Sequence, residues 1–225
     1  MRHHQRGFTL IEIAIVLVII GLLLGGVLKG QELINSAKVK NFAQDFRNIP
    51  LYIYGYQDKY KAIPGDDASA TVRNANATTA STPTGGIGNG VINGNWNSVT
   101  ATDESYLFWQ HVRLAGLATG PTSTADATYI PRNAEGGTIG IESGSNAYIG
   151  PTTAAPVVQG LSGSYVICST GILGKFAKQL DTTMDDGNTQ TGSMRTVAGN
   201  HTRGNPALTT ATVNDDTSYT VCLGM

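Results

Sequence analysis

The chain has 225 residues, of which 14% are charged, and its net charge at neutral pH is -1. This length suffices for one folded domain with an appendage, and the near-neutral charge provides no basic face for binding nucleic acid. Glycine is abundant, with 28 residues, which favours short strands, turns and long loops over a helical bundle.

The chain begins with a basic leader and a long apolar run. Residues 8–28 contain one charged side chain, Glu12, and a helix of this length is about 31 Å long, close to the hydrocarbon thickness of a bilayer. Arg2 and Arg6 precede the run and Lys29 follows it. The positive-inside rule therefore places the leader in the cytoplasm and the rest of the chain outside.

Three interpretations of this segment compete. A cleaved signal peptide needs a small-residue cleavage site after the apolar run, and LKGQELINSAK fits that pattern only weakly. A plain membrane anchor leaves Glu12 unexplained, because a carboxylate in the hydrocarbon costs about 2.5–3.5 kcal/mol on insertion scales. The third interpretation depends on the stretch RGFTLIE, residues 6–12.

RGFTLIE closely resembles the processing site of type IV pilins and of the pseudopilins of type II secretion. The resemblance implies that a prepilin peptidase cuts after Gly7 and methylates the new N-terminal residue, Phe8. It makes Glu12 the fifth mature residue. The implied division is a cleaved leader (1–7), a transmembrane and filament-core helix (8–30), an amphipathic helical half (31–63) and a globular head (64–225).

The fold class that we expect is α+β. A long N-terminal helix, membrane-spanning in its first half and amphipathic in its second, packs on a globular head with an antiparallel sheet and a C-terminal disulfide loop. The amine of Phe8 that cleavage creates is a cation near the depth of Glu12, and pairing in a non-polar setting is strong. Our hypothesis is that Glu12 meets the Phe8 amine of a neighbouring subunit, drives polymerisation and sets the stagger.

The glycines of the apolar run allow three interpretations. Gly21 and Gly25 form a small-xxx-small pattern, which permits close approach of helices in a membrane. Alternatively, glycine is simply tolerated in a membrane span, or it weakens the helix locally.

The next segment predicts a continuing helix with one apolar face. Its apolar residues recur with gaps of three and four, which is a helical period of about 3.5. We expect a kink or local break at Pro50 and the end of the helix at Pro64-Gly65. The apolar positions are Val39, Phe42, Phe46, Ile49, Ile53, Tyr56 and Tyr60.

In the head, residues 66–102 predict a loop region. A helix should begin with Thr102 as its cap and end at Gly116 or Gly120, with His111 in a structural role. A short helix is also expected from about Ile172. Strands are expected at 137–143, 146–150, 164–169 and 218–224.

The two cysteines, Cys168 and Cys222, lie in the last two of these strands. In a chain that leaves the cytoplasm such a pair forms a disulfide, the alternative being two buried free thiols. We expect the bridge and antiparallel neighbours. Pilins often carry a C-terminal disulfide-bounded region, and this spacing resembles one.

Inside that loop, four oxygen donors surround Gly187: Asp181, Asp185, Asp186 and Asn188. Such a density of oxygen ligands can hold a calcium ion, although the spacing is not that of an EF-hand. The alternative, which we favour, is that these side chains cap the helix and shape the turn. No other cofactor is expected.

We find no catalytic constellation in the sequence and expect no enzyme. We expect a structural subunit that polymerises with itself. The family resemblance adds an inner-membrane platform protein, its ATPase, minor pilins and, in a Gram-negative cell, an outer-membrane secretin as partners. The precursor would sit in the inner membrane and the filament would be extracellular or periplasmic. The alternative is a minor pseudopilin whose head binds a ligand at the tip.

The head also resembles that of a group of large-headed bacterial prepilins. The stretches that carry this resemblance are PGDD, W-x-H-x-x-x-AGL and DDGNTQTG.

Overall fold

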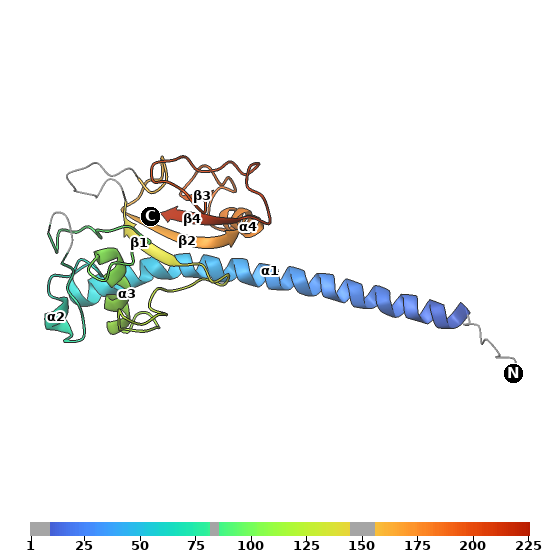
Figure 1. The fold of residues 1–225 in the computed structure, drawn as a ribbon, viewed down its shortest axis with the longest axis horizontal. Coiled ribbons are helices and arrows are strands. Elements are labelled where there is room, and N and C mark those ends of the chain that lie inside the picture. The colour runs from blue at the N-terminus through green and yellow to red at the C-terminus, as the bar shows by residue number, and fades with distance from the viewer. Residues whose placement is uncertain (1–9, 82–85, 145–155) are drawn as a thin grey trace, which may run out of the picture. The chain divides into compact units, whose positions relative to one another are not determined.

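The computed structural model describes residues 10–81, 86–144 and 156–225, and its contacts divide the chain into two units, Met1–Lys38 and Val39–Met225. The elements follow each other as labelled in Figure 1. They are α1 (Leu10–Tyr60), α2 (Ala70–Arg73), α3 (Glu104–Leu114), β1 (Ile139–Ser143), β2 (Tyr165–Leu173), α4 (Gly174–Met184), β3 (Met194–Ala198) and β4 (Ser218–Gly224). We call the second unit the head.

Helix α1 is continuous over 51 residues and includes Pro50. The local break expected at Pro50 is therefore wrong. Proline removes one backbone hydrogen bond from a helix, but Ile49 and Ile53 on either side are fully buried, and their packing holds the helix together. The helix ends at Tyr60, before the expected Pro64-Gly65, because Lys61 adopts a left-handed conformation with φ of 56°.

The apolar stripe of α1 is confirmed within the head. Six of its seven predicted positions are buried, and only Tyr60 is partly exposed. Five of the buried members pack in one core with side chains of α3, α4 and the sheet. These members are Val39, Phe42, Phe46, Ile49 and Ile53, against Phe108, Val112, Phe176, Leu180, Ile141 and Ile167.

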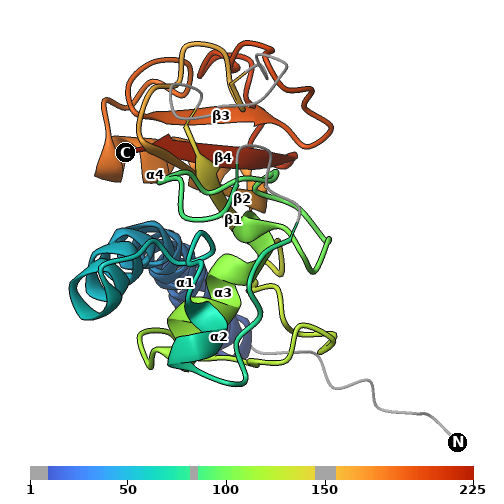
Figure 2. The same cartoon turned by 90° about the vertical axis from the view of Figure 1, so that its left-hand side faces the viewer.

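The four strands form one antiparallel sheet in the order β1-β2-β4-β3. Figure 2 shows them in this order, with β3 and β1 at the two edges. The expected strands at 137–143, 164–169 and 218–224 are confirmed as β1, β2 and β4. The sequence missed β3, and the expected strand at 146–150 lies outside the described residues.

The two faces of the sheet carry different cores, because successive side chains of a strand point to opposite faces. Ile141, Ile167 and Val221 face the cluster that includes α1, α3 and α4. The opposite face holds Val166, Cys168, Val197 and Cys222, which pack with Val157, Val158, Leu161 and Ala207 from the loops. The sheet therefore lies between a helical layer and a loop layer.

Helix α3 begins one position later than expected. Asp103, not Thr102, occupies the N-cap position, and its Oδ2 accepts a hydrogen bond from Ser98 Oγ at 2.6 Å. The helix ends at Leu114, and Gly116 then takes the left-handed conformation, with φ of 77°.

Candidate functional site

The first part of α1 is an exposed apolar surface. Among the described residues, α1 is the helix long and apolar enough to cross a membrane, and none of its most apolar window is buried. Every large apolar side chain from Leu10 to Leu28 is at least 46% exposed. Apolar patches of this size mark sites of membrane or protein interaction.

Glu12 lies in the first turn of α1, inside this apolar surface. It is exposed, like the apolar side chains around it. The next charged pair is Lys29 and Glu32, whose Nζ and Oε2 atoms are 2.6 Å apart at the far end of the apolar run. Gly7 and Phe8, the predicted cleavage and methylation residues, lie outside the described residues.

The glycines of this surface have open space around them. A Cβ built on Gly21 or Gly25 meets no heavy atom within 4 Å, and the same holds for Gly26 and Gly30. The isolated subunit therefore places no steric demand for glycine at these positions.

The two cysteines form the expected disulfide, with Cys168 and Cys222 opposite each other on β2 and β4. The bond lies on the face of the sheet that packs against the loop layer. It joins two central strands, so it fixes the sheet rather than a surface loop.

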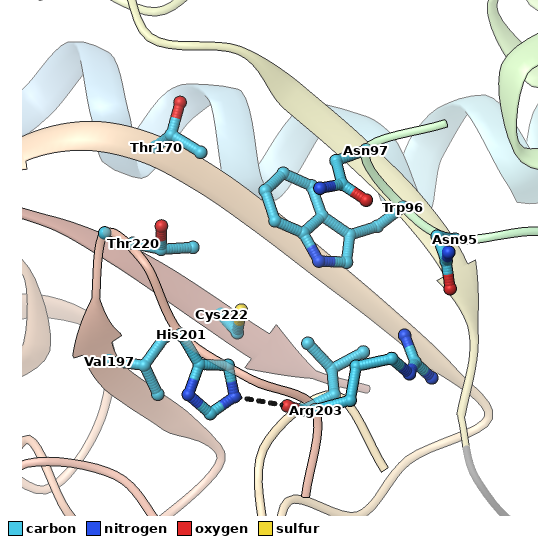
Figure 3. Close-up of a pocket in the computed structure, with 11 residues that line it drawn as sticks. Asn95, Trp96, Asn97, Thr170, Val197, His201, Arg203, Thr220 and Cys222 are labelled. Carbon is cyan, nitrogen blue, oxygen red and sulfur yellow. Dashed lines mark hydrogen bonds between the residues drawn. The ribbon is translucent and has the colours of Figure 1, made fainter. Parts of the chain in front are cut away.

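Beside the disulfide, the head has a cavity of about 250 Å³. Figure 3 shows that the indole of Trp96 forms part of its wall, with His201 and Arg203 facing it. His201 Nε2 is 2.6 Å from the backbone oxygen of Val157. An aromatic wall with a few polar groups is typical of small-molecule sites. No sequence pattern predicted this cavity, because its lining residues come from distant segments of the chain.

The cavity wall is held by a partly buried ion pair. Arg203 Nη1 and Nη2 each donate to one oxygen of Glu142 at 2.8 Å, and Glu142 also accepts from Trp96 N at 2.8 Å. Such a two-point contact is rigid. It links the loop after β3, strand β1 and the loop that carries Trp96.

The PGDD stretch is an architectural junction. Gly65 takes φ of 94°, and its amide donates to His111 Nδ1 at 2.9 Å. Asp66 accepts hydrogen bonds from the amides of Gly88, Asn89 and Gly90. Asp67 accepts from Tyr56 Oη and pairs with Arg73, both at 2.8 Å. These contacts join the end of α1 to α2, α3 and the 88–90 loop.

His111 has the structural role that we expected. It is almost fully buried, its Nε2 is 2.8 Å from Thr78 O, and its Nδ1 accepts from Gly65. These two partners correspond to the neutral form with the proton on Nε2. Burial lowers the pKa of His111, which favours the same form.

Three of the four predicted metal ligands come together. Ligand atoms of Asp181, Asp185 and Asp186 lie within 4.8 Å of one another. Asn188 is in the same turn: its amide donates to Asp186 Oδ1 at 2.8 Å, and its own Oδ1 accepts from Gln190 N at 3.2 Å. The turn-shaping hydrogen bonds that we favoured are therefore present for Asp186 and Asn188.

Sequence reasoning also missed a buried acid at the start of α3. Glu104 is fully buried, and its Oε2 accepts from Asn93 N at 2.7 Å and from Asn93 Nδ2 at 3.1 Å. Its place in a first helical turn suggested only a favourable interaction with the helix dipole. Asn93, whose loop covers Glu104, lies 11 positions earlier in the chain. No short sequence pattern therefore indicates that Glu104 is buried.

Comparison with known proteins gives one result. The model of the prokaryotic N-terminal methylation motif matches residues 2–28. No match was found among curated proteins or among solved structures. The matched residues include the predicted cleavage site, Glu12 and the apolar run. The N-terminal segment therefore carries a type IV prepilin-like signal, that of a pilin-like or pseudopilin-like protein.

Proposed function

We propose that the chain is a structural subunit that polymerises into a type IV pilus or a related filament through the first part of α1. The observation that carries this proposal is an exposed apolar helix segment, with one acidic residue, directly within a methylation motif. A surface of this kind is stable only in lipid or against other apolar helices. The role is structural rather than enzymatic.

Assembly would move the segment from one apolar setting to another. Before assembly, the exposed side chains between Leu10 and Leu28 lie in the inner membrane with the head outside the cytoplasm. In the filament, the same side chains pack against neighbouring helices. Because lipid tails and packed apolar side chains are similarly apolar, the transfer costs little, and an assembly ATPase acting through a platform protein supplies the direction.

Glu12 gives this assembly its register. Cleavage after Gly7 by a prepilin peptidase creates a charged amine on Phe8, four positions before Glu12. When a neighbouring subunit is displaced along the filament axis, its Phe8 amine lies beside this carboxylate. Each lateral contact then neutralises two charges in a setting of low dielectric, where attraction is strong and where an uncompensated carboxylate is costly.

Glu12→Gln and Glu12→Ala test the proposal. Both variants should insert in the membrane and be processed as the wild type is, because the apolar run is intact, but the yield of sheared filaments should fall at least tenfold. Glu32→Gln is the matched control, since it removes a carboxylate from the same helix outside the apolar run. Normal filaments from the Glu12 variants would refute the role of the charge.

A minor subunit at the filament tip is the second candidate. The cavity beside Trp96 favours it, because a binding head needs a concave site. The abundance of the chain in sheared filaments separates the two: a body subunit is the main component by mass, whereas a tip subunit contributes a few copies for each filament. In either case minor pilins, and a secretin in a Gram-negative cell, are expected partners.

A further inference from the structure

Asp181 is a buried carboxylate with no partner in the described part of the chain. It lies in the last turn of α4, its exposed fraction is 0%, and neither Oδ1 nor Oδ2 has a hydrogen-bond partner there. Buried polar side chains are almost always hydrogen-bonded, and an unsatisfied buried charge is strongly destabilising. A bound cation would supply the partner that both oxygens lack among the described residues.

The surroundings of Asp181 exclude an anion and favour a cation. Asp185 and Asp186 bring carboxylate oxygens within 4.8 Å of its own. Three carboxyl side chains therefore share one small space, which suits a cation and not an anion.

The geometry matches the coordination shell of calcium. Calcium binds carboxylate oxygens at about 2.3–2.6 Å, so two ligands on opposite sides of one ion are about 4.8 Å apart. The observed limit of 4.8 Å between the three carboxylates thus allows them to share an ion. Magnesium prefers a smaller octahedral shell and usually takes only one or two carboxylates, so a site with three favours calcium.

We propose that Asp181, Asp185 and Asp186 bind a calcium ion that joins the end of α4 to the loop before β3. Asp185 extends this link, because its oxygens accept hydrogen bonds from Ser193 Oγ at 3.0 Å and from Met194 N at 2.7 Å. Met194 is the first residue of β3, an edge strand of the sheet. The ion therefore stabilises one edge of the head, with an affinity suited to an extracellular module, about 10⁻⁴–10⁻³ M.

Thermal unfolding of the detergent-solubilised full chain tests this proposal. The protein is first treated with a chelator and then measured alone, with about 10 mM CaCl₂, and with MgCl₂ or NaCl of equal ionic strength. If free calcium exceeds the dissociation constant 100-fold, the midpoint should rise by roughly 5–10 °C for a head of this size. Magnesium should give a smaller rise and sodium none.

Asp181→Asn distinguishes a ligand from an ordinary structural residue. The variant should lose the calcium-dependent rise, and without calcium it should be at least as stable as the wild type, because it removes an uncompensated buried charge. Asp186→Asn, at an exposed ligand, should weaken the calcium response without risk to folding. Asp216→Asn is the matched control, an exposed carboxylate on the loop before β4 that should leave the response intact.

Two results would overturn the proposal. One is a wild-type midpoint that calcium does not raise more than sodium does. The other is an unchanged calcium response in both Asp181→Asn and Asp186→Asn. A rise that magnesium produces as strongly as calcium would assign the site to divalent cations in general and contradict the choice of calcium.

Discussion

Glu104 is a fully buried carboxylate that lies close to a second buried acid, Asp66. Burial raises the pKa of Glu104 well above its ordinary value of 4.5, the hydrogen bonds from Asn93 oppose the rise, and the charge of Asp66 adds to it. The folded state therefore holds this proton more tightly than the unfolded state does. The resulting stability is fully present below pH 4.5 and is lost as the pH rises through the raised pKa.

Glu104→Gln should remove this loss. Glutamine keeps an oxygen that can accept the hydrogen bonds of Asn93 but carries no charge, so the variant should be more stable than the wild type at about pH 8 by on the order of 1–3 kcal/mol. Thermal unfolding at about pH 5 and pH 8 measures the difference. Asp58→Asn, an exposed control, should follow the wild type. Equal pH dependence of Glu104→Gln and wild type would contradict this reading of Glu104.

The sequence predicted the contacts of some residues and not those of others. The bridge between Cys168 and Cys222 was predictable, because both cysteines lie in alternating strand patterns and the N-terminal segment predicts export of the chain. The orphaned carboxylate of Asp181 was not, because its burial depends on packing in three dimensions. The sequence placed Asp181 among oxygen donors, but only the structure distinguishes it from exposed Asp186.

Helix α1 combines two surfaces that follow different rules. Its first part is apolar all round and exposed, whereas within the head only one stripe is buried. The helical period of the stripe predicted the buried face correctly, because side chains three and four positions apart share one face. The local break at Pro50 was predicted wrongly, because the packing of its neighbours compensates for the lost hydrogen bond.

Gly21 and Gly25 offer a test of how the apolar helices approach one another. Replacing both by alanine meets no steric obstacle in the isolated subunit and raises helix propensity by roughly 1 kcal/mol per residue. Membrane insertion should therefore be unaffected. If neighbouring helices pack closely at these glycines, the yield of sheared filaments from the double variant should fall severalfold.

The pair Gly26→Ala and Gly30→Ala is the matched control for this experiment. It makes the same chemical change with the same spacing on a different side of the helix, and open space likewise surrounds both residues. Filaments should form normally from this control. Equal yields from the two double variants would show that Gly21 and Gly25 have no special role in packing.

The head as a whole depends on contacts between distant parts of the chain. Local patterns predicted β1, β2 and β4, but not β3, whose short sequence MRTVA includes the charged Arg195. The loop layer over the opposite face of the sheet was also unpredictable, because its contacts join residues 157–161 to the region around Ala207. Such packing has no periodic signature in the sequence.

The disulfide should be a main source of stability for the head. Cys168 and Cys222 are 54 positions apart and enclose α4 and β3. By the chain-entropy account a loop of this length contributes about 4 kcal/mol, so Cys168→Ala/Cys222→Ala should lower the unfolding midpoint by roughly 8–16 °C. Wild-type protein treated with a reductant should behave like the double variant. An unchanged midpoint in the double variant would contradict this account.

The central claim is that the trimmed N-terminal helix builds a filament. Mass spectrometry of filaments sheared from wild-type cells tests it most directly. We predict that this chain is abundant in them and that its mature form begins at Phe8 with one added methyl group. Filaments that lack the chain, or a chain that retains its first seven residues in those cells, would contradict the claim.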